Sequence, residues 1–429
     1  MRFASLLLLL NVQYLIGQNI YFPPNNEDTW ATTSPQEIGW CQQKVDTLLD
    51  YLEDQNTEAF IILKDGKIVI EEYFGTFGKD SLWYWASAGK TLTAFLTGIA
   101  QEKGLLSIQD STSQYLGPGW TALAPQQERN ITIWNQLTMT TGLDDEVADP
   151  FCTDNNCLRF KSDPGMRWAY HNAPYTLISR VLEVASGQDY NVWTALELKN
   201  KIGMDGFWFP SGFNKIYFSK PRSMARFGLL IQAGGVWDGT TIMQDTGYFR
   251  DMITPSQTIN PAYGYLWWLN GQSTFMIPQT QFVFAGQMSP NAPSDMFAAM
   301  GKNGQLINIV PSEGLVVVRM GNSPDNSLVP VLFQDEMWAY ISDLACTATS
   351  VEDIGPMTLE LSPNPASDKL LIQHHGSQIQ RGEIRSLTGQ IMKEWKNLEK
   401  VSLEGLSTGL YVIRVQIDGV WRGQKFYKN

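Results

Sequence analysis

The sequence predicts an α+β fold, in which an antiparallel sheet is flanked by helices and joined to a helical lobe, followed by a small C-terminal β-sandwich. Two apolar β-hairpins stand far apart in the chain, over residues 59–73 and near residues 297–320. Helical patterns occur over residues 92–99 and 175–187, within the region between about 90 and 290 that we expect to form the helical lobe. The last ~75 residues show short alternating runs separated by turn signals.

Each hairpin has a recognisable turn. Asp65-Gly66 divides the first into two strands. The second consists of two β-rich runs, residues 296–311 and 314–321, joined by a Pro-Ser-Glu-Gly turn. We expect Lys302 and Gly304 to lie on the first of these two strands.

A nucleophile and a base stand together at Ser87 and Lys90. The residues that follow predict a helix, because apolar side chains recur at helical spacing: Leu92, Phe95, Leu96 and Ile99. Ser87 therefore lies near a helix N-terminus, which favours a developing negative charge, and Lys90 is three residues on, within reach of its hydroxyl. A desolvated lysine can activate a serine. The Ser-x-x-Lys pattern alone is weak, because a chain of this length holds about one by chance.

Two further motifs follow in the chain. Tyr170 and Asn172 are two residues apart in a loop punctuated by Gly and Pro, so their side chains can enter one cleft, and a helix over residues 175–187 follows. Lys302-Asn-Gly304 is the third motif.

In this order, the three motifs resemble those of the penicillin-recognising serine hydrolases: class C β-lactamases, D-Ala-D-Ala peptidases and related esterases and amide hydrolases. The resemblance covers roughly residues 35–346 and includes the connecting segments 131–143, 225–237 and 263–268. It implies a β-lactamase/transpeptidase-like fold for a hydrolase domain over residues 18–350. The active site would lie where the sheet meets the helical lobe, and helices near 40–52 and 328–344 would pack together.

The resemblance also implies roles in acyl transfer. Ser87 attacks a carbonyl, while Lys90 and Tyr170 take the serine proton and return it to the leaving group. Tyrosine ordinarily titrates near pH 10, so Tyr170 acts as a base only if Lys90 or Lys302 lowers its pKa. The alternative for Tyr170 is a core tyrosine with a satisfied hydroxyl.

Substrate binding is implied for four residues. Asn172 would hold Lys90 and a substrate amide, Gly304 would allow close approach, and Lys302 would meet a substrate carboxylate. The backbone N–H groups of Ser87 and Gln305 would form the oxyanion hole. β-Lactamases usually have threonine at the position of Asn303, so this departure leaves the identity of the substrate undetermined. The alternative for Lys302 is a charged residue on an edge strand, with no role in binding.

The two ends of the chain predict export. Residues 1–17 have a positive start, a short apolar core and a small residue at the end, as in a cleaved signal peptide, and no later stretch is long enough to span a membrane. Residues 351–429 resemble the sorting domain of type IX secretion, on the segments 362–369, 406–415 and 424–429. We therefore expect the protein to interact with the type IX secretion machinery through this domain, and to be secreted or displayed at the cell surface. The alternative is a generic surface β-sandwich.

Composition narrows the function further. The net charge of −12 argues against nucleic-acid partners, whose phosphates an acidic protein repels. Three histidines leave little material for a Ser-His-Asp triad or a metal site, and the four cysteines have no metal-ligand spacing, so we expect no metal and no cofactor.

The four cysteines allow three pairings, and export favours oxidation. Cys152 and Cys157 bracket a polar, turn-forming run that brings them into bonding range. In the fold implied by the resemblance, the first and last helices of the catalytic unit lie side by side, which implies a Cys41–Cys346 bridge. The alternative is that Cys41 and Cys346 are buried free thiols.

The sequence thus predicts an exported serine hydrolase that forms an acyl-enzyme on an amide, ester or β-lactam carbonyl of a small-molecule or peptide substrate. Lys302 extends this prediction to substrates that bear a carboxylate. The alternative is a non-catalytic or penicillin-binding surface module that keeps the fold without efficient turnover.

Overall fold

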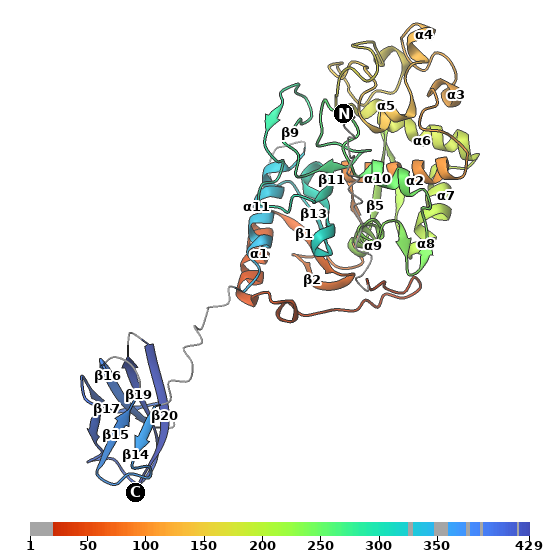
Figure 1. The fold of residues 1–429 in the computed structure, drawn as a ribbon. Helices are drawn as coiled ribbons and strands as arrows, with labels where there is room; N and C mark the ends of the chain where they lie inside the picture. The colour runs from red at the N-terminus through yellow and green to blue at the C-terminus, as the bar shows by residue number, and fades with distance from the viewer. Residues whose placement is uncertain (1–19, 325–328, 347–358, 375–377, 387–388, 418–419) are drawn as a thin grey trace, which may run out of the picture. The chain divides into compact units, whose positions relative to one another are not determined.

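The computed structural model describes residues 20–324, 329–346, 359–374, 378–386, 389–417 and 420–429 (Figure 1). They fall into two compact units that divide after Cys346. The predicted signal peptide, residues 1–17, lies outside the described residues. Within these ranges, none of the helices has the length and apolar character needed to cross a membrane.

The unit that ends at Cys346 corresponds to the predicted hydrolase domain, and we call it the catalytic unit. It is built on a six-stranded antiparallel sheet in the order β2-β1-β13-β12-β11-β8. Its strands are β1 (Thr57–Lys64), β2 (Lys67–Tyr73), β8 (Trp268–Leu269), β11 (Phe297–Gly301), β12 (Gln305–Val310) and β13 (Leu315–Gly321). The first predicted hairpin is confirmed as β1 and β2. Asp65 and Gly66 reverse the chain with φ of 50° and 83°, which is the left-handed pair that a tight hairpin turn requires.

The second predicted hairpin is wrong in one respect, because it contains three strands. Its first run splits into β11 and β12, and Lys302–Gly304 forms a single 3₁₀ turn between them. Asn303 and Gly304 have φ of 65° and 74°. Asn-Gly is a strong turn signal, so Lys302 and Gly304 lie in a turn and not on a strand.

Helices cover both faces of the sheet (Figure 1). On one side lies α9 (Pro221–Gln232), and on the other α1 (Gln42–Asp54) and α11 (Val331–Ser342). Gly228 lets α9 approach closely, because an added Cβ would lie 2.5 Å from Val316 Cγ1. The rings of Tyr51 and Tyr340 stack between α1 and α11 with centroids 4.4 Å apart.

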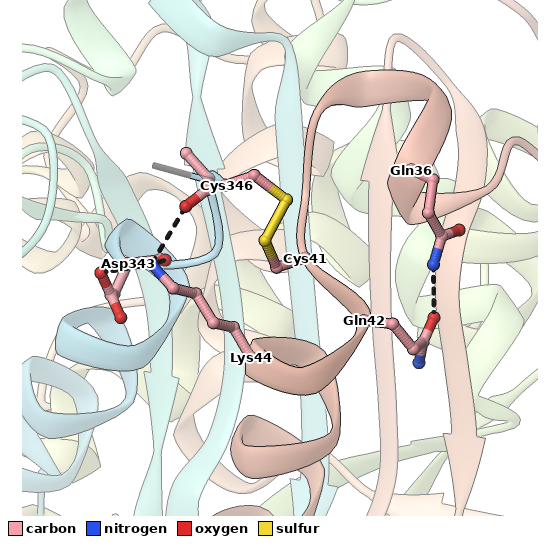
Figure 2. The surroundings of a disulfide bond; sticks show 7 residues. Gln36, Cys41, Gln42, Lys44, Asp343 and Cys346 are labelled. Carbon is pink, nitrogen blue, oxygen red and sulfur yellow. Dashed lines mark hydrogen bonds and ion pairs between the residues drawn. A yellow bond between two sulfur atoms is a disulfide. The ribbon is translucent and has the colours of Figure 1, made fainter. Parts of the chain in front are cut away.

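Both predicted disulfides are present. Cys41, immediately before α1, is bonded to Cys346 with a Cα–Cα distance of 4.9 Å (Figure 2). Beside this bridge, Lys44 Nζ lies 2.9 Å from Asp343 Oδ1. Cys152 is bonded to Cys157, so all four cysteines are paired.

The helical lobe lies beside the sheet (Figure 1). Its helices are α2 (Lys90–Glu102), α3 (Ser113–Leu116), α4 (Pro125–Glu128), α5 (Ile133–Leu137), α6 (Asn172–Ser186), α7 (Tyr190–Thr194), α8 (Asn200–Ile202) and α10 (Thr246–Met252). A small sheet joins β3 (Trp83–Tyr84), β5 (Asn214–Ser219) and β4 (Phe207–Ser211). Helix α6 begins at Asn172, three residues earlier than predicted, and ends at Ser186, where Gly187 caps it with φ of 70°.

The C-terminal unit is the predicted small β-sandwich. One sheet has the order β14-β15-β18 and the other β17-β16-β19-β20. The strands are β14 (Glu360–Ser362), β15 (Lys369–Gln373), β16 (Arg381–Ser386), β17 (Ile391–Trp395), β18 (Lys400–Ser402), β19 (Gly409–Ile417) and β20 (Val420–Lys428). Alternate residues of β19 from Tyr411 to Ile417 are buried in a core shared with Leu370 and Ile372 of β15.

Candidate active site

Ser87 lies on a sharp turn between a strand and a helix. Strand β3 pairs with β5, and the Trp85 N–H donates to Tyr217 O at 2.8 Å. The chain then enters a 3₁₀ turn, Ala86–Gly89, that leads directly into α2. Ala86 has φ of 46°, a strained value for a residue with a side chain. The turn leaves Ser87 half-buried at the start of α2, where free N–H groups favour negative charge.

Lys90 is buried against the Ser87 hydroxyl. Its side chain is 4% exposed, and Nζ lies 2.8 Å from both Ser87 Oγ and Asn172 Oδ1. The rings of Tyr170 and Tyr175 face the amine at 5.0 and 4.4 Å from their centroids. No carboxylate among the described residues forms an ion pair with it. Burial therefore lowers the pKa of Lys90 from 10.5 to about 7, so the neutral amine is well populated at neutral pH.

Tyr170 is held by an aromatic cluster. Its ring stacks on Trp268 of β8 at 5.6 Å and meets Tyr263 edge-on at 6.2 Å. Burial raises the pKa of Tyr170 well above its usual value, and a hydrogen bond with Ser87 opposes this only in part. Neither Lys90 nor Lys302 lowers it, so the resting phenol is protonated. This arrangement favours Lys90 as the base and Tyr170 as a proton donor.

The end of β11 packs directly on the Ser87 turn. A Cβ added to Gly301 would lie 2.5 Å from Trp85 O and 3.1 Å from Ser87 N. β8 pairs with β11 only at Phe297 and Ala298, so the backbone from Ala299 onward forms a free edge on that side. This free edge, rather than the turn that follows it, is the part of the sheet next to Ser87.

Gln305 does not lie where the oxyanion prediction requires. It is fully buried on β12, between β11 and β13, and its side chain is bonded to the backbone of the next strand. Gln305 Nε2 donates to Gly321 O at 2.6 Å, and Oε1 accepts from Gly321 N at 3.1 Å. The role of Gln305 is thus to join strand ends, and β11 separates it from the edge that faces Ser87.

The Lys302–Gly304 turn is held by hydrogen bonds from a buried arginine, Arg319, whose role the sequence analysis did not predict. Arg319 on β13 is 0% exposed and donates to Asn303 O at 2.6 Å and Gly304 O at 3.1 Å. Three more acceptors satisfy the same guanidinium: Thr57 Oγ1, Gln55 O and Asn322 O. Lys302 itself is exposed. A charged residue inside the apolar run of β13 was the one available signal for Arg319.

Four of the predicted site residues therefore lie together: Ser87, Lys90, Tyr170 and Asn172. The other three lie in the turn between β11 and β12 or just after it: Lys302, Gly304 and Gln305. Among the described residues, no group of three or more His, Cys, Asp and Glu side chains is arranged to hold a metal ion.

A family model described as Beta-lactamase matches residues 49–332, about two thirds of the chain. The chain belongs to the beta-lactamase family. Members of this family are hydrolases, among them esterases, amidases and penicillin-binding proteins. A second model, described as Secretion system C-terminal sorting domain, matches residues 360–428. This sorting domain directs the beta-lactamase-family unit to type IX secretion, so the protein is secreted or displayed at the cell surface.

Curated relatives agree with this family. An uncharacterized protein of Alkalihalophilus pseudofirmus is 24% identical over 310 residues, which cover 63% of this chain and 85% of that protein. Penicillin-binding protein 4* of Bacillus subtilis is 30% identical over 215 residues, which cover 46% of this chain and 37% of that protein.

Solved structures share the fold. A putative 6-aminohexanoate-dimer hydrolase from Bacillus anthracis has a TM-score of 0.58 at 16% identity, covering 75% of this chain and 89% of that one. A putative beta-lactamase from Bacteroides dorei has a TM-score of 0.57 at 15% identity, covering 71% and 99%. The predicted fold class is confirmed.

Proposed function

We propose that the protein is a secreted serine hydrolase that forms an acyl-enzyme on Ser87. The contact between Ser87 Oγ and the buried Lys90 Nζ at 2.8 Å carries this proposal, because it pairs a hydroxyl with an amine whose pKa is about 7. A base with a pKa near the working pH is well matched to proton transfer.

The reaction proceeds in two halves. Neutral Lys90 takes the proton of the Ser87 hydroxyl as Oγ bonds to the substrate carbonyl carbon. The Ser87 N–H and the free edge of β11 stabilise the oxyanion, and each such donor is worth about 3 kcal/mol. Tyr170 donates its proton to the leaving group as the bond to the carbonyl carbon breaks, and Lys90 returns a proton to Tyr170. Water then attacks the acyl-enzyme by the same route in reverse and releases the acid.

Asn172 positions the base. Its Oδ1 accepts from Lys90 Nζ at 2.8 Å, which leaves its amide nitrogen available for a substrate carbonyl. The substrate class that fits this machinery is an ester, an amide or a β-lactam, in a small molecule or a peptide. A substrate carboxylate would be met by the exposed Lys302.

Covalent labelling tests the proposal. A fluorophosphonate and a fluorescent penicillin are applied to the wild type, to Ser87→Ala and to Ser211→Ala, a control at an exposed serine of β4. Labelling of the wild type and the control, but not of Ser87→Ala, is the expected result. Equal labelling of all three would refute the assignment of Ser87. Labelling without turnover on esters, amides or nitrocefin would instead favour a penicillin-binding surface module.

A further inference from the structure

A long uncharged segment runs through the catalytic unit. Residues 252–294 contain no Asp, Glu, Lys, Arg or His, although charged residues make up 17% of the chain. A stretch of that length with the chain's average composition would hold about seven charges. The segment contains β8 and then a hairpin of β9 (Thr274–Phe275) and β10 (Phe284–Ala285), which we call the neutral hairpin, residues 274–285.

Two connections join the neutral hairpin to the surroundings of Tyr170. The first is through the chain itself, because Trp268, which stacks on Tyr170, lies on the strand that leads into the hairpin. The second is a hydrogen bond, in which Gln281 Nε2 donates to Trp168 O at 3.1 Å, two residues before Tyr170. The hairpin is therefore attached to the segment that carries the proposed proton donor.

The base of the neutral hairpin is fixed, while two apolar side chains next to this base are exposed. Met276 N donates to Asn260 Oδ1 at 3.1 Å, and Phe275 stacks on Phe284 at 5.2 Å. Phe282 is 62% exposed and Val283 is 48% exposed. Large apolar side chains on a fixed support are typical of a surface that binds an apolar group.

We propose that the neutral hairpin binds the leaving group of the substrate, and that this leaving group is uncharged and apolar. The proposal rests on the function proposed above, in which Tyr170 protonates the leaving atom, so that the leaving group lies on the Tyr170 side of Ser87. A charged leaving group would lose hydration there with no opposite charge to compensate. An apolar one gains about 25 cal/mol for each Å² removed from water.

An exposed apolar surface of this kind could instead bind a lipid surface or a second copy of the chain. The attachment to the Tyr170 segment favours the substrate, because neither of the other two requires contact with the reaction centre. Both are measurable outcomes of the experiment.

The experiment compares two esters with the same acyl group and the same ring in the leaving group. They are 2-naphthyl acetate and its 6-sulfonated analogue, which carries a negative charge. The ratio of kcat/KM for the neutral ester to that for the charged ester is measured for the full-length wild type, Phe282→Lys, Phe282→Leu and Val283→Lys. Phe209→Lys is the matched control, since Phe209 is an exposed phenylalanine, at 53%, on β4.

We expect a wild-type ratio of about ten or more, since a well-placed apolar contact discriminates by about 10- to 200-fold. Phe282→Lys and Val283→Lys should lower the ratio about tenfold, because each removes an apolar contact from the neutral ester and offers a positive charge to the sulfonate, whereas Phe282→Leu and Phe209→Lys should keep it. Circular dichroism checks that each variant is folded. A wild-type ratio near one, or a ratio that neither lysine variant lowers, would overturn the inference.

Loss of self-association or of binding to phosphatidylcholine vesicles in Phe282→Lys, at an unchanged ratio, would also overturn it and would assign the surface to that partner. Failure of the proposed function has a different result, because Ser87→Ala would then hydrolyse both esters at the wild-type rate. Hydrolysis that depends on Ser87 but shows no preference between the esters contradicts the leaving-group inference alone.

Discussion

Replacing Lys90 by methionine should lower the activity strongly and yet stabilise the folded protein at neutral and acidic pH. Methionine keeps the length of the side chain but removes the amine, which is 4% exposed and has no acidic partner among the described residues. The loss of a positioned base should lower kcat by about 10²–10⁴-fold. The gain in stability follows from the pKa of the buried amine.

The magnitude comes from the difference between 10.5, the ordinary pKa of lysine, and about 7 in the folded protein. At 1.36 kcal/mol for each pH unit, this corresponds to about 5 kcal/mol. The unfolded chain binds this proton up to about pH 10.5, but the folded chain releases it near pH 7. The free energy of unfolding therefore rises with pH across this window. The destabilisation is complete below about pH 7 and absent above about pH 10.5.

Two measurements check this prediction. Denaturant unfolding of wild type and Lys90→Met from pH 6 to 10 should show a stability difference that shrinks by several kcal/mol as pH rises. Lys103→Met, at an exposed lysine that follows the same helix, should stay within about 1 kcal/mol of the wild type at each pH. The wild-type acylation rate should fall about tenfold from pH 8 to pH 6, with a midpoint near 7. A stability difference and an acylation rate that are both independent of pH would refute the reasoning.

Three further predictions concern the same unit. Tyr170→Phe should lower kcat about 10²–10⁴-fold with little change in KM, and an unchanged steady-state kcat would remove Tyr170 from the mechanism. Lys302→Ala should raise KM about 2- to 5-fold for carboxylate-bearing substrates and leave KM for neutral esters unchanged, because an exposed charge contributes at most about 1 kcal/mol. Equal changes in KM for both kinds of substrate would contradict carboxylate binding by Lys302. The Cys41→Ser/Cys346→Ser variant should lose about 4–6 kcal/mol of unfolding free energy, and free thiols in the denatured, unreduced wild type would contradict the bridge.

Local signals predicted the features that depend on a few neighbouring residues. Asp65-Gly66 fixed the first hairpin turn, because the required backbone conformation is a property of those two residues. The helix after Ser87 followed from apolar spacing, and one helical turn sets the distance between Ser87 and Lys90. The sequence could therefore predict the central pair of the site.

The third motif was misplaced because two local patterns competed over the same residues. Lys302-Asn-Gly304 resembles a strand motif, but Asn303-Gly304 is also a hairpin-turn signal, and the turn prevails in the structure. The resulting register sets Gly301 opposite Gln305 and Leu306 opposite Arg319. Such pairings join distant positions, so the roles of Gln305 and Arg319 were beyond local reasoning.

The direction in which the pKa of Tyr170 shifts could not be predicted from the sequence either. The pKa of its phenol is raised because the ring is buried against Tyr263 and Trp268, almost a hundred residues away in the chain. Desolvation depends on such packing and not on residue type. The same holds for Lys90, whose motif identified a base but not how far its pKa falls.

The Cys41–Cys346 bridge has a mechanical consequence for a protein with a C-terminal sorting unit. Tension on that unit enters the catalytic unit along the backbone at Cys346, four residues after the end of α11. The covalent cross-link passes this load to Cys41 as well, so a pull on the tail reaches α1 and α11 together. Helix α11 therefore cannot be peeled from the sheet by itself, without α1.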